Sequence, residues 1–481
     1  NSNSEDENND QSGSYGISSF NSNGFTLIGN GGRTNASGSE YVGWTFRKQA
    51  KFFDVVTWTG DGATRNISHN LGSVPGMIII KRTDSASGWV VYHRSVGATK
   101  YLRINTNAAE ASYSLYFNDT EPTSSVFTVG SNGDVNGSSN TYVAYLFAHN
   151  NSDGEFGPTQ DQDIIKCGSF SHNYNGAEVN LGFEPQWILL KAKDQTGNWL
   201  IFDAMRGIVT GGLSGDGDAG LIANSSNAEN VTTWGVDLTS TGFIVYGNNI
   251  LSSGNAVYMA IRRGPLAEPT SATDVFAMDT LGSSAPYFDS NHIVDMALVK
   301  SAGATGDWYN YARHIGEKYL KTNATSAEAN ASEAGFDFMD GHIDANWGGT
   351  NAYSWMWKRA PGYFDVVAYD GNLQQSNVAH NLGVVPEMIW TKCRGNTYAW
   401  GVYHKDIGVG AASGSNGTGL VLNTSDGLNA GADSPLYQHP TDTHFQPRGT
   451  QNQNFPYIAY LFATLAGVSK VGSFTLGSSG S

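Results

Sequence analysis

Hydrophobic residues in this chain occur in short runs, rich in β-branched and aromatic side chains and separated by Gly, Ser, Asp and Asn. Residues 77–80 and 89–92 are two such runs, and residues 102–106 alternate between apolar and polar positions. Both patterns predict β-strands, the second with one buried face. No apolar helical period persists through a helix-length stretch, and residues 324–333, rich in Ala and Glu, would form a short helix at most.

The same pattern returns along the chain. The segments FDVV, HNLG and WVVYH at residues 53–56, 69–72 and 89–93 recur as FDVV, HNLG and WGVYH at residues 364–367, 380–383 and 400–404. A closing phrase begins at Tyr41, Tyr142, Tyr258, Tyr353 and Tyr457. These tyrosines lie about 100 residues apart, the size of a small domain rather than of a solenoid repeat. Repetition favours a scaffold or adhesion protein over an enzyme, whose catalytic constellation is usually built once.

We expect four repeated units and two partial ones. The units span residues 51–150, 160–264, 270–360 and 361–466, preceded at 1–50 by the second half of a unit and followed at 467–481 by the opening strand of a further one. The third unit is the most diverged, because it lacks the Leu-Gly-x-x-Pro turn of the others. Short strands and dense turns predict all-β units, tandem antiparallel β-sandwich or jelly-roll-like domains.

The recurring turn has a physical explanation. In residues 69–75, Leu71 can anchor under a sheet, Gly72 permits a positive φ, and Pro75 fixes the backbone ahead of an apolar strand. The preceding histidines, His69 and His380, are expected to hydrogen-bond this turn.

The two partial units leave two arrangements open. Residues 14–47 resemble the second half of a unit, and the segment 470–474 parallels 166–170. Either the sequence is a piece of a longer polypeptide, which is the commoner case, or the partial units complete each other by strand donation.

Composition narrows the class of protein. Charged residues make up only 15%, so Ser, Thr, Asn and Gly must cover the surface, as in many extracellular β-rich proteins. The formal net charge of −16 predicts repulsion from nucleic acid and from anionic membranes. No apolar run approaches a membrane-spanning length and residue 1 opens no signal peptide, so we expect no membrane insertion.

Candidate chemistry is sparse, and no catalytic, cofactor-binding or metal-binding residue is predicted. His93 and His404 occupy equivalent places after a strand, where a metal pair or a catalytic base is the functional interpretation. The unrelated Asp203 and Ala312 at those places in the other units favour a structural role. Cys167 and Cys393 fall at different points of the repeat; a disulfide stays open, but two buried thiols are favoured.

Aromatic and acidic residues give two further hypotheses. A Trp recurs in every unit, as Trp89, Trp199, Trp308 and Trp400. A platform for sugar rings is one interpretation, and a core anchor is the favoured one. Acidic loops at 216–218, 161–163 and 5–7 could hold Ca²⁺, although none fits an EF-hand and solvated carboxylates are favoured.

The phrases at 142–147 (YVAYLF), 69–75 (HNLGSVP), 89–93 (WVVYH) and 123–130 (TSSVFTVG) resemble a module of virion structural proteins in tailed phages, especially marine phages and those of cyanobacteria. The likeness covers most of the chain and is weakest in the third unit. It implies a tail-fibre-like or virion-surface role and assigns no catalytic or binding residue.

These observations predict a non-enzymatic structural protein of a phage particle, located in the virion or outside the cell. It would serve as a fibre, appendage or surface component, with host attachment as an added role. Its expected partners are other virion proteins, copies of itself in a head-to-tail arrangement, or a host-surface glycan. A carbohydrate-binding adhesin is the alternative, and a glycan depolymerase is the third hypothesis, because two catalytic carboxylates can meet from anywhere in a sequence.

Overall fold

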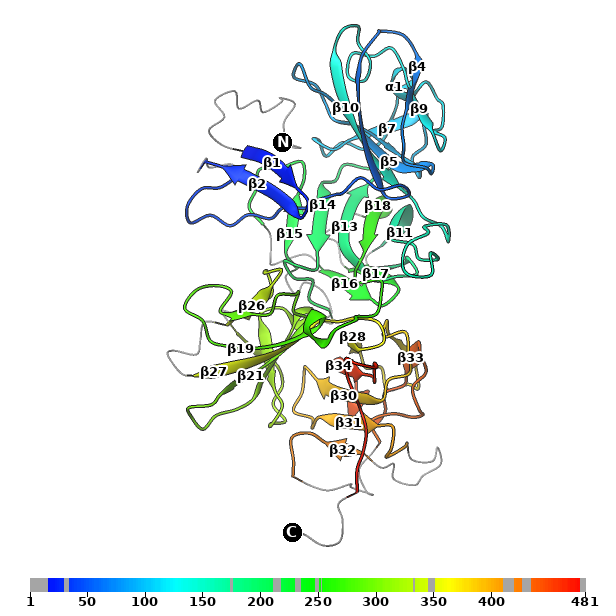
Figure 1. Cartoon of the computed structure of the whole chain (residues 1–481). Coiled ribbons are helices and arrows are strands. Elements are labelled where there is room, and N and C mark those ends of the chain that lie inside the picture. Colours follow the sequence, from blue (N-terminus) through cyan, green and yellow to red (C-terminus); the bar gives the residue numbers. More distant parts are fainter. Residues whose placement is uncertain are drawn as a thin grey trace.

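The computed structural model describes residues 16–29, 34–173, 176–210, 218–229, 235–246, 251, 253–331, 334–344, 351–409, 419–425 and 434–475. The molecule is elongated, with four β-rich units following one another from the N-terminal to the C-terminal side (Figure 1). Strands dominate the described residues, so the predicted all-β class is confirmed. None of their helices is both long and apolar enough to cross a membrane.

Unit 1 follows a short leading hairpin. The hairpin consists of β1 (Gly16–Asn21) and β2 (Gly24–Ile28). Unit 1 contains β3 (Phe53–Thr59), β4 (Arg65–Ser68), β5 (Pro75–Arg82), β6 (Val90–His93), β7 (Lys100–Arg103), β8 (Ala111–Ser112), α1 (Ser114–Phe117), β9 (Val126–Val129) and β10 (Thr141–Ala148). Its large sheet has the order β3-β10-β5-β6-β7-β8, and β4 pairs with β9 in a small sheet.

Unit 2 repeats this arrangement. It contains β11 (Ile165–His172), β12 (Ala177–Asn180), β13 (Pro185–Ala192), β14 (Trp199–Asp203), β15 (Gly220–Ile222), β16 (Gly235–Thr239), β17 (Gly242–Tyr246) and β18 (Gly254–Arg262). The large sheet is β11-β18-β13-β14-β15 and the small sheet is β12-β17-β16.

Unit 3 keeps the same order despite its divergent sequence. It contains η1 (Ala272–Asp274), β19 (Phe276–Thr280), β20 (Phe288–Asp289), β21 (Met296–Ser301), β22 (Tyr309–Ala312), η2 (Arg313–Ile315), β23 (Lys318–Lys321), β24 (Ala329–Asn330), β25 (Ala334–Gly335), β26 (Gly341–Asp344) and β27 (Ala352–Trp357). Its sheets are β19-β27-β21-β22-β23-β24 and β20-β26-β25. The short helix expected at 324–333 is wrong for the described residues there, which form an extended segment and β24.

Unit 4 is the C-terminal one. It contains β28 (Phe364–Asp370), β29 (Val378–Ala379), β30 (Met388–Cys393), β31 (Gly401–His404), β32 (Leu420–Val421), β33 (His444–Phe445), η3 (Gly449–Gln451) and β34 (Pro456–Phe462). Its large sheet is β28-β34-β30-β31-β32, and β29 pairs with β33.

The strand pairing is nested in every unit. The first strand pairs antiparallel with the last, as β3 with β10, and the last strand also pairs with the strand after the turn, as β10 with β5. The second strand pairs with a late strand of the unit in the small sheet, as β12 with β17. These outer pairs are nested as in a jelly roll, whereas β5 to β8 pair one after another within the large sheet. The arrangement agrees with the predicted all-β sandwich class.

The recurring turn behaves as its sequence predicts. Its leucines are buried at Leu71, Leu181 and Leu382, and its glycines have φ of 70° at Gly72, 75° at Gly182 and 76° at Gly383. A carboxylate of the opening strand fastens two of these turns, because Asp54 and Asp365 accept the N–H of Asn70 and Asn381, each at 2.8 Å.

We expect Gly383→Ala to lower the free energy of unfolding by about 1–2 kcal/mol, since an L-residue is strained at positive φ. An added Cβ would meet nothing within 4 Å, so the cost is conformational and not steric. Thermal unfolding of Gly383→Ala beside Gly133→Ala, where the site is equally open and φ is not positive, measures this. Equal stability of the two variants would contradict the expectation.

The large sheet of unit 2 is covered on both faces. On β13, Ile188 and Leu190 pack in the core of unit 2 between its two sheets, while Trp187 and Leu189 face the other way. They join one hydrophobic cluster with Met77 of unit 1. Units 3 and 4 are joined by a similar cluster, which brings Met296 of β21 together with Val366 of β28. The units therefore form a continuous body rather than beads on flexible linkers.

Candidate functional site

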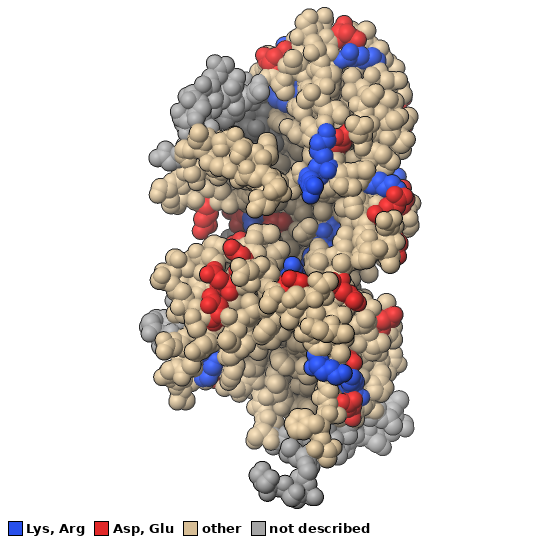
Figure 2. All heavy atoms as spheres, viewed as in Figure 1, with Lys and Arg blue, Asp and Glu red and all other residues tan. Residues whose placement is uncertain are grey.

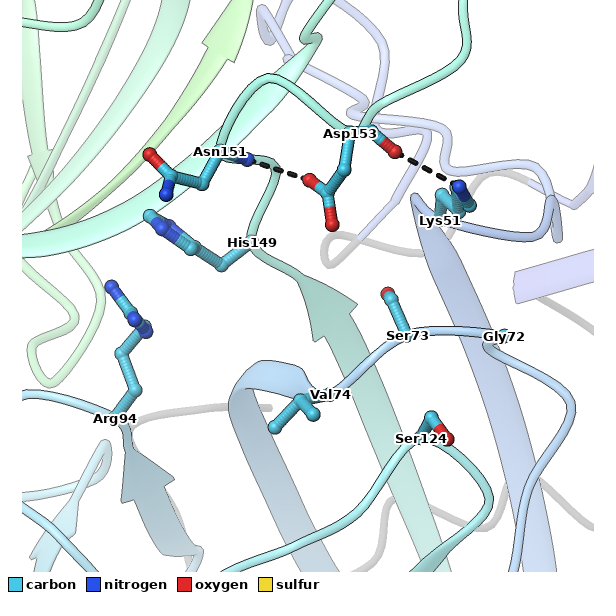
Figure 3. A pocket seen from close by; sticks show the side chains of 9 residues that line it. All are labelled: Lys51, Gly72, Ser73, Val74, Arg94, Ser124, His149, Asn151 and Asp153. Carbon is cyan, nitrogen blue, oxygen red and sulfur yellow. Dashed lines mark hydrogen bonds between the residues drawn. The ribbon is translucent and has the colours of Figure 1, made fainter.

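A cavity of about 370 Å³ lies where the recurring turn of unit 1 meets the segment that leads into unit 2 (Figure 3). We call it the turn pocket. It is lined by Lys51, Gly72, Ser73, Val74, Arg94, Ser124, His149, Asn151 and Asp153. The turn supplies one wall, the end of β6 supplies Arg94, and the segment after β10 supplies His149 and the two residues beyond it.

Two cations and one neutral imidazole line the turn pocket. Lys51 Nζ donates to the carbonyl of Asp153 at 3.0 Å and forms an ion pair with Glu155. The Nδ1 atom of His149 accepts the N–H of Cys167 at 3.2 Å, so its proton resides on Nε2. Burial, assisted by Arg94, lowers the pKa of His149 to about 4, so the ring is an uncharged donor at neutral pH.

The pocket contains the carboxylate of Asp153 as well as the two basic side chains, and its Arg94 differs in one respect from the equivalent cation of unit 4. There, Lys405 stands in the place of Arg94, and Glu387 forms an ion pair with it at 2.7 Å. Unit 1 has Gly76 at the position of Glu387, and a Cβ on Gly76 would lie 2.8 Å from Cys167 Sγ. Close approach of β11 thus requires glycine, and it leaves the Arg94 site without that carboxylate.

The lining suits a polar ligand. Besides the cations it offers Ser73, Ser124 and Asn151, and the buried Ser73 Oγ makes no hydrogen bond within the described residues. None of the nine lining residues is a Phe, Trp or Tyr, so the pocket does not use the aromatic stacking proposed from the recurring tryptophans.

The strand-end histidines have structural contacts. His93 is buried, its Nδ1 accepts the N–H of Ser95 at 3.2 Å, and its Nε2 lies 3.1 Å from the carbonyl of Tyr258 in unit 2. His404 accepts the N–H of Asp406 in the same way. Asp203 replaces the imidazole in unit 2 and accepts the N–H of Met205 at 3.1 Å. The shared feature is an acceptor that closes the turn after the strand.

His69 and His380 contact the recurring turn as expected. The Nδ1 atoms accept the N–H of Leu71 and Leu382, each at 3.3 Å. The opposite ring nitrogens lie 3.2 Å and 3.1 Å from the carbonyls of Thr123 and Thr441. Each histidine bridges the turn to a distant loop of its own unit.

The expectation that all four recurring tryptophans are core anchors is wrong for Trp308, which is 37% exposed. Trp89 is half-buried and packs against the hydrophobic cluster that contains the core of unit 1. Trp199 and Trp400 are fully buried, but between units, where their indole N–H groups donate to the carbonyls of Arg103 and Lys321, each at 2.8 Å. These tryptophans lie on the sheet face that points away from the core of their own unit. Each tryptophan is therefore buried only where a neighbouring unit covers that face.

The acidic loops hold their carboxylates in protein hydrogen bonds. Asp218 is buried and accepts the N–H groups of Val209 and Val236, and Asp161 accepts from Thr159. Residues 216–217 and 5–7 lie outside the described residues. In the part of the chain that the structure describes, His, Cys, Asp and Glu form no group of three that could hold a metal ion. Cys167 and Cys393 are buried and free.

Sequence inspection missed an ionic cluster at the meeting point of units 2, 3 and 4, which we call the ionic junction. Arg359 forms a bidentate pair with Glu184 at 2.7 and 2.6 Å and also bonds Asp365 at 2.6 Å. The side chains of all three residues are at most 5% exposed. His314 Nε2 lies 2.9 Å from Arg359 Nη1 and accepts a hydrogen bond from it, because a guanidinium only donates.

One departure from the repeat signals the ionic junction. Glu184 occupies the turn position that holds Val74 in unit 1 and Val385 in unit 4. Those valines are 51% and 50% exposed, whereas Glu184 is covered by the segment that carries Arg359. Burial opposes ionisation of Glu184, but the Arg359 and Arg263 charges outweigh it and lower its pKa to about 2.

Surface charge is dispersed on the face shown in Figure 2, where acidic and basic residues appear singly or in small groups among uncharged side chains. This distribution agrees with the low charged fraction of the sequence.

Comparison with known proteins gives a match that is interrupted in the most diverged unit. No curated protein matches the chain. A family match covers residues 1–265 and 308–481, and the interruption falls in unit 3, where the recurring turn is absent. Because the match extends over most of the sequence, the chain belongs to the family described as Domain of unknown function (DUF7483).

Proposed function

We propose that this chain is a non-enzymatic structural protein of a phage particle, acting as a fibre, appendage or surface component that bears load and presents loops to the outside. The observation that carries the proposal is the burial of the contacts between units. Apolar sheet faces and a buried ionic cluster join consecutive units, as expected of a stiff multidomain body. The sequence resemblance to virion modules gives the location.

Particle composition tests this role. Purified phage particles from the source of this sequence should contain the chain at many copies, as measured by mass spectrometry, and antibody labelling should place it on a fibre or on the particle surface in electron micrographs. Its absence from particles that are otherwise complete would overturn the proposal.

The turn pocket favours glycan attachment as a second function. Arg94, the His149 Nε2–H group and the Ser73 hydroxyl provide donors for a carboxylated or sulfated sugar. This is the adhesin alternative, with acidic glycans as the ligand class. Release of reducing ends from such a glycan would instead support the depolymerase hypothesis.

Replacing Arg94 with Ala is expected to weaken binding to acidic glycans at least tenfold, because it removes the lining cation that forms no ion pair among the described residues. Lys405→Ala is the matched control, since the equivalent cation in unit 4 is already paired with Glu387. Glycan-array binding of the wild type and both variants measures this. Unchanged binding by Arg94→Ala, or equal loss by both variants, would contradict attachment at this pocket.

A further inference from the structure

An exposed aromatic group lies on the outer face of the large sheet in unit 3. Trp308 precedes β22, and Tyr353 and Trp355 belong to β27. The ring centroids of Trp308 and Trp355 are 5.4 Å apart with 31° between their planes, and those of Tyr353 and Trp355 are 6.4 Å apart with 33°. Trp308 is 37% exposed, and the other two side chains are half-buried. We call these three residues the aromatic platform.

Unit 4 covers only part of this sheet face. Met296 and Ala312 pack into the cluster that joins units 3 and 4, and the hydroxyl of Tyr460 donates to Asn310 Oδ1. Successive residues of an extended segment point to opposite sides, so Trp308 lies on the same face as Asn310 and Ala312. No hydrophobic core cluster of the described residues includes the aromatic platform. The platform therefore lies on the contact face of unit 3 but outside the contact itself.

Strand register places Tyr353 on the outer face. The closing tyrosine of unit 1, Tyr142, pairs with Arg82 and is buried in the core of its unit. Tyr353 pairs instead with Lys300, which occupies the repeat position of Lys81, one residue before Arg82. A shift of one residue moves a side chain to the opposite face of a sheet. The tyrosine that closes the core in unit 1 is therefore turned outward in unit 3.

Burial does not explain the aromatic residues of the platform. In the other units an aliphatic residue takes the place of Tyr353: Val143, Val257 and Ile458. Val257 and Ile458 are buried in the clusters that join neighbouring units. The covered faces thus carry an aliphatic side chain where the open face of unit 3 carries an aromatic one. Exposure of apolar rings to water is unfavourable, so rings placed on an open face are expected to have a binding partner.

The aromatic platform is too small for a protein partner. An aromatic side chain buries at most about 250 Å², whereas a specific protein interface needs about 800 Å² on each side. Only part of each platform ring is exposed. A few flat rings suit a ligand that is itself a flat ring with an apolar face, such as a sugar or a nucleobase. The net charge of −16 opposes a nucleic acid and so favours the sugar.

Polar groups border the aromatic platform. Asp307, the residue before Trp308, forms an ion pair with Lys321 at 2.7 Å and accepts from Asn323 Nδ2 at 3.0 Å. Asn323 Oδ1 in turn accepts the N–H of Trp308 at 3.1 Å. The side chain of Asp307 is 36% exposed, and its hydrogen bond with Lys321 lowers its pKa, so it is ionised at neutral pH. This carboxylate can accept from sugar hydroxyls and repels the carboxylate of an acidic sugar.

We propose that the aromatic platform binds a neutral polysaccharide of β-linked hexopyranoses. The apolar C–H face of one sugar ring stacks on Trp308 and Trp355, the next ring extends toward Tyr353, and ring hydroxyls donate to Asp307. Equatorial substituents leave the flat face of such sugars open to stacking. The platform lies in another unit than the turn pocket and takes another class of ligand, so it goes beyond the function proposed above.

Titration calorimetry of the full chain with β-linked oligosaccharides of glucose, galactose and mannose tests the site. Trp308→Ala is expected to weaken binding of the preferred oligosaccharide about tenfold, comparable to the removal of an aromatic ring beneath a nucleobase. Trp308→Phe should retain part of the affinity, because a stacking face remains. Tyr113→Ala is the matched control, since Tyr113 is an aromatic residue of unit 1 that is also 37% exposed, and it should bind as the wild type does.

Three results would overturn the proposal. The first is a wild type that binds none of these oligosaccharides. The second is an affinity that Trp308→Ala leaves unchanged or that Trp308→Ala and Tyr113→Ala reduce equally, with circular dichroism showing that both variants are folded. The third is tighter binding of a single-stranded oligonucleotide that is lost in Trp308→Ala, which would assign the aromatic platform to nucleobases.

Discussion

Replacing Arg359 with Ala is expected to lower the free energy of unfolding by about 3–5 kcal/mol, the usual cost of removing one partner from a buried ion pair. The change leaves the carboxylates of Glu184 and Asp365 buried without their shared cation. Glu184 and Asp365 belong to units 2 and 4, so the loss of their shared cation weakens the contact between units, and units 2, 3 and 4 should separate before the unit cores unfold. Urea unfolding followed by tryptophan fluorescence measures the loss.

Lys405→Ala is the control for Arg359→Ala. Lys405 pairs with Glu387 at 2.7 Å, but the two side chains are 34% and 24% exposed. Exposed pairs contribute about 0–1 kcal/mol, so the control should stay close to the wild type. Limited proteolysis adds a second readout, because Arg359→Ala should be cut first between units. Equal stability of the two variants would show that burial of the ionic junction contributes nothing.

Acidification from pH 7 to pH 4 is expected to remove about 4 kcal/mol of stability, if each of three buried histidines retains a single unit of pKa shift. Burial lowers the pKa of His93, His314 and His342 to about 4. The unfolded chain binds these protons near pH 6.5, so between pH 6.5 and 4 it holds more protons than the folded chain. Stability therefore falls as the pH falls.

Glu184 extends this effect to lower pH. Its folded pKa of about 2 lies below its ordinary value of 4.5, so its contribution is complete above pH 4.5 and is lost as the pH falls toward 2. Urea unfolding at a series of pH values measures the slope, and His342→Gln should reduce it because one of the titrating rings is gone. Stability that is constant from pH 7 to pH 4 would contradict the expectation.

The elements that sequence reasoning placed correctly are those governed by local rules. The short apolar runs at 77–80 and 89–92 lie in or directly beside β5 and β6, and the turn glycine Gly72 has the positive φ that its position requires. The thiols of Cys167 and Cys393 are buried and free, as favoured. These features depend on residues close in sequence, so a single segment contains enough information to specify them.

The turn pocket and the ionic junction depend on contacts between units, so rules that act on neighbouring residues in the sequence could not predict them. Trp199 and Trp308 occupy the same repeat position, but one is buried by a neighbouring unit and the other is 37% exposed. Glu184 reads as an ordinary exposed turn residue until the segment carrying Arg359 covers it. The turn pocket likewise combines the recurring turn of unit 1 with residues of the segment that leads into unit 2.

The sequence by itself determined the all-β class, the repeated framework and the chemistry of the recurring turn, because alternation, glycine and proline act within a few residues. Tertiary structure alone decided which sheet faces are covered, where charges are buried and which cations stay unneutralised. Those outcomes depend on how successive units dock, and docking brings together residues far apart in the chain, such as Glu184 and Arg359. The repeated segments specify the fold of each unit. Positions that depart from the repeat, such as Glu184, form contacts between units.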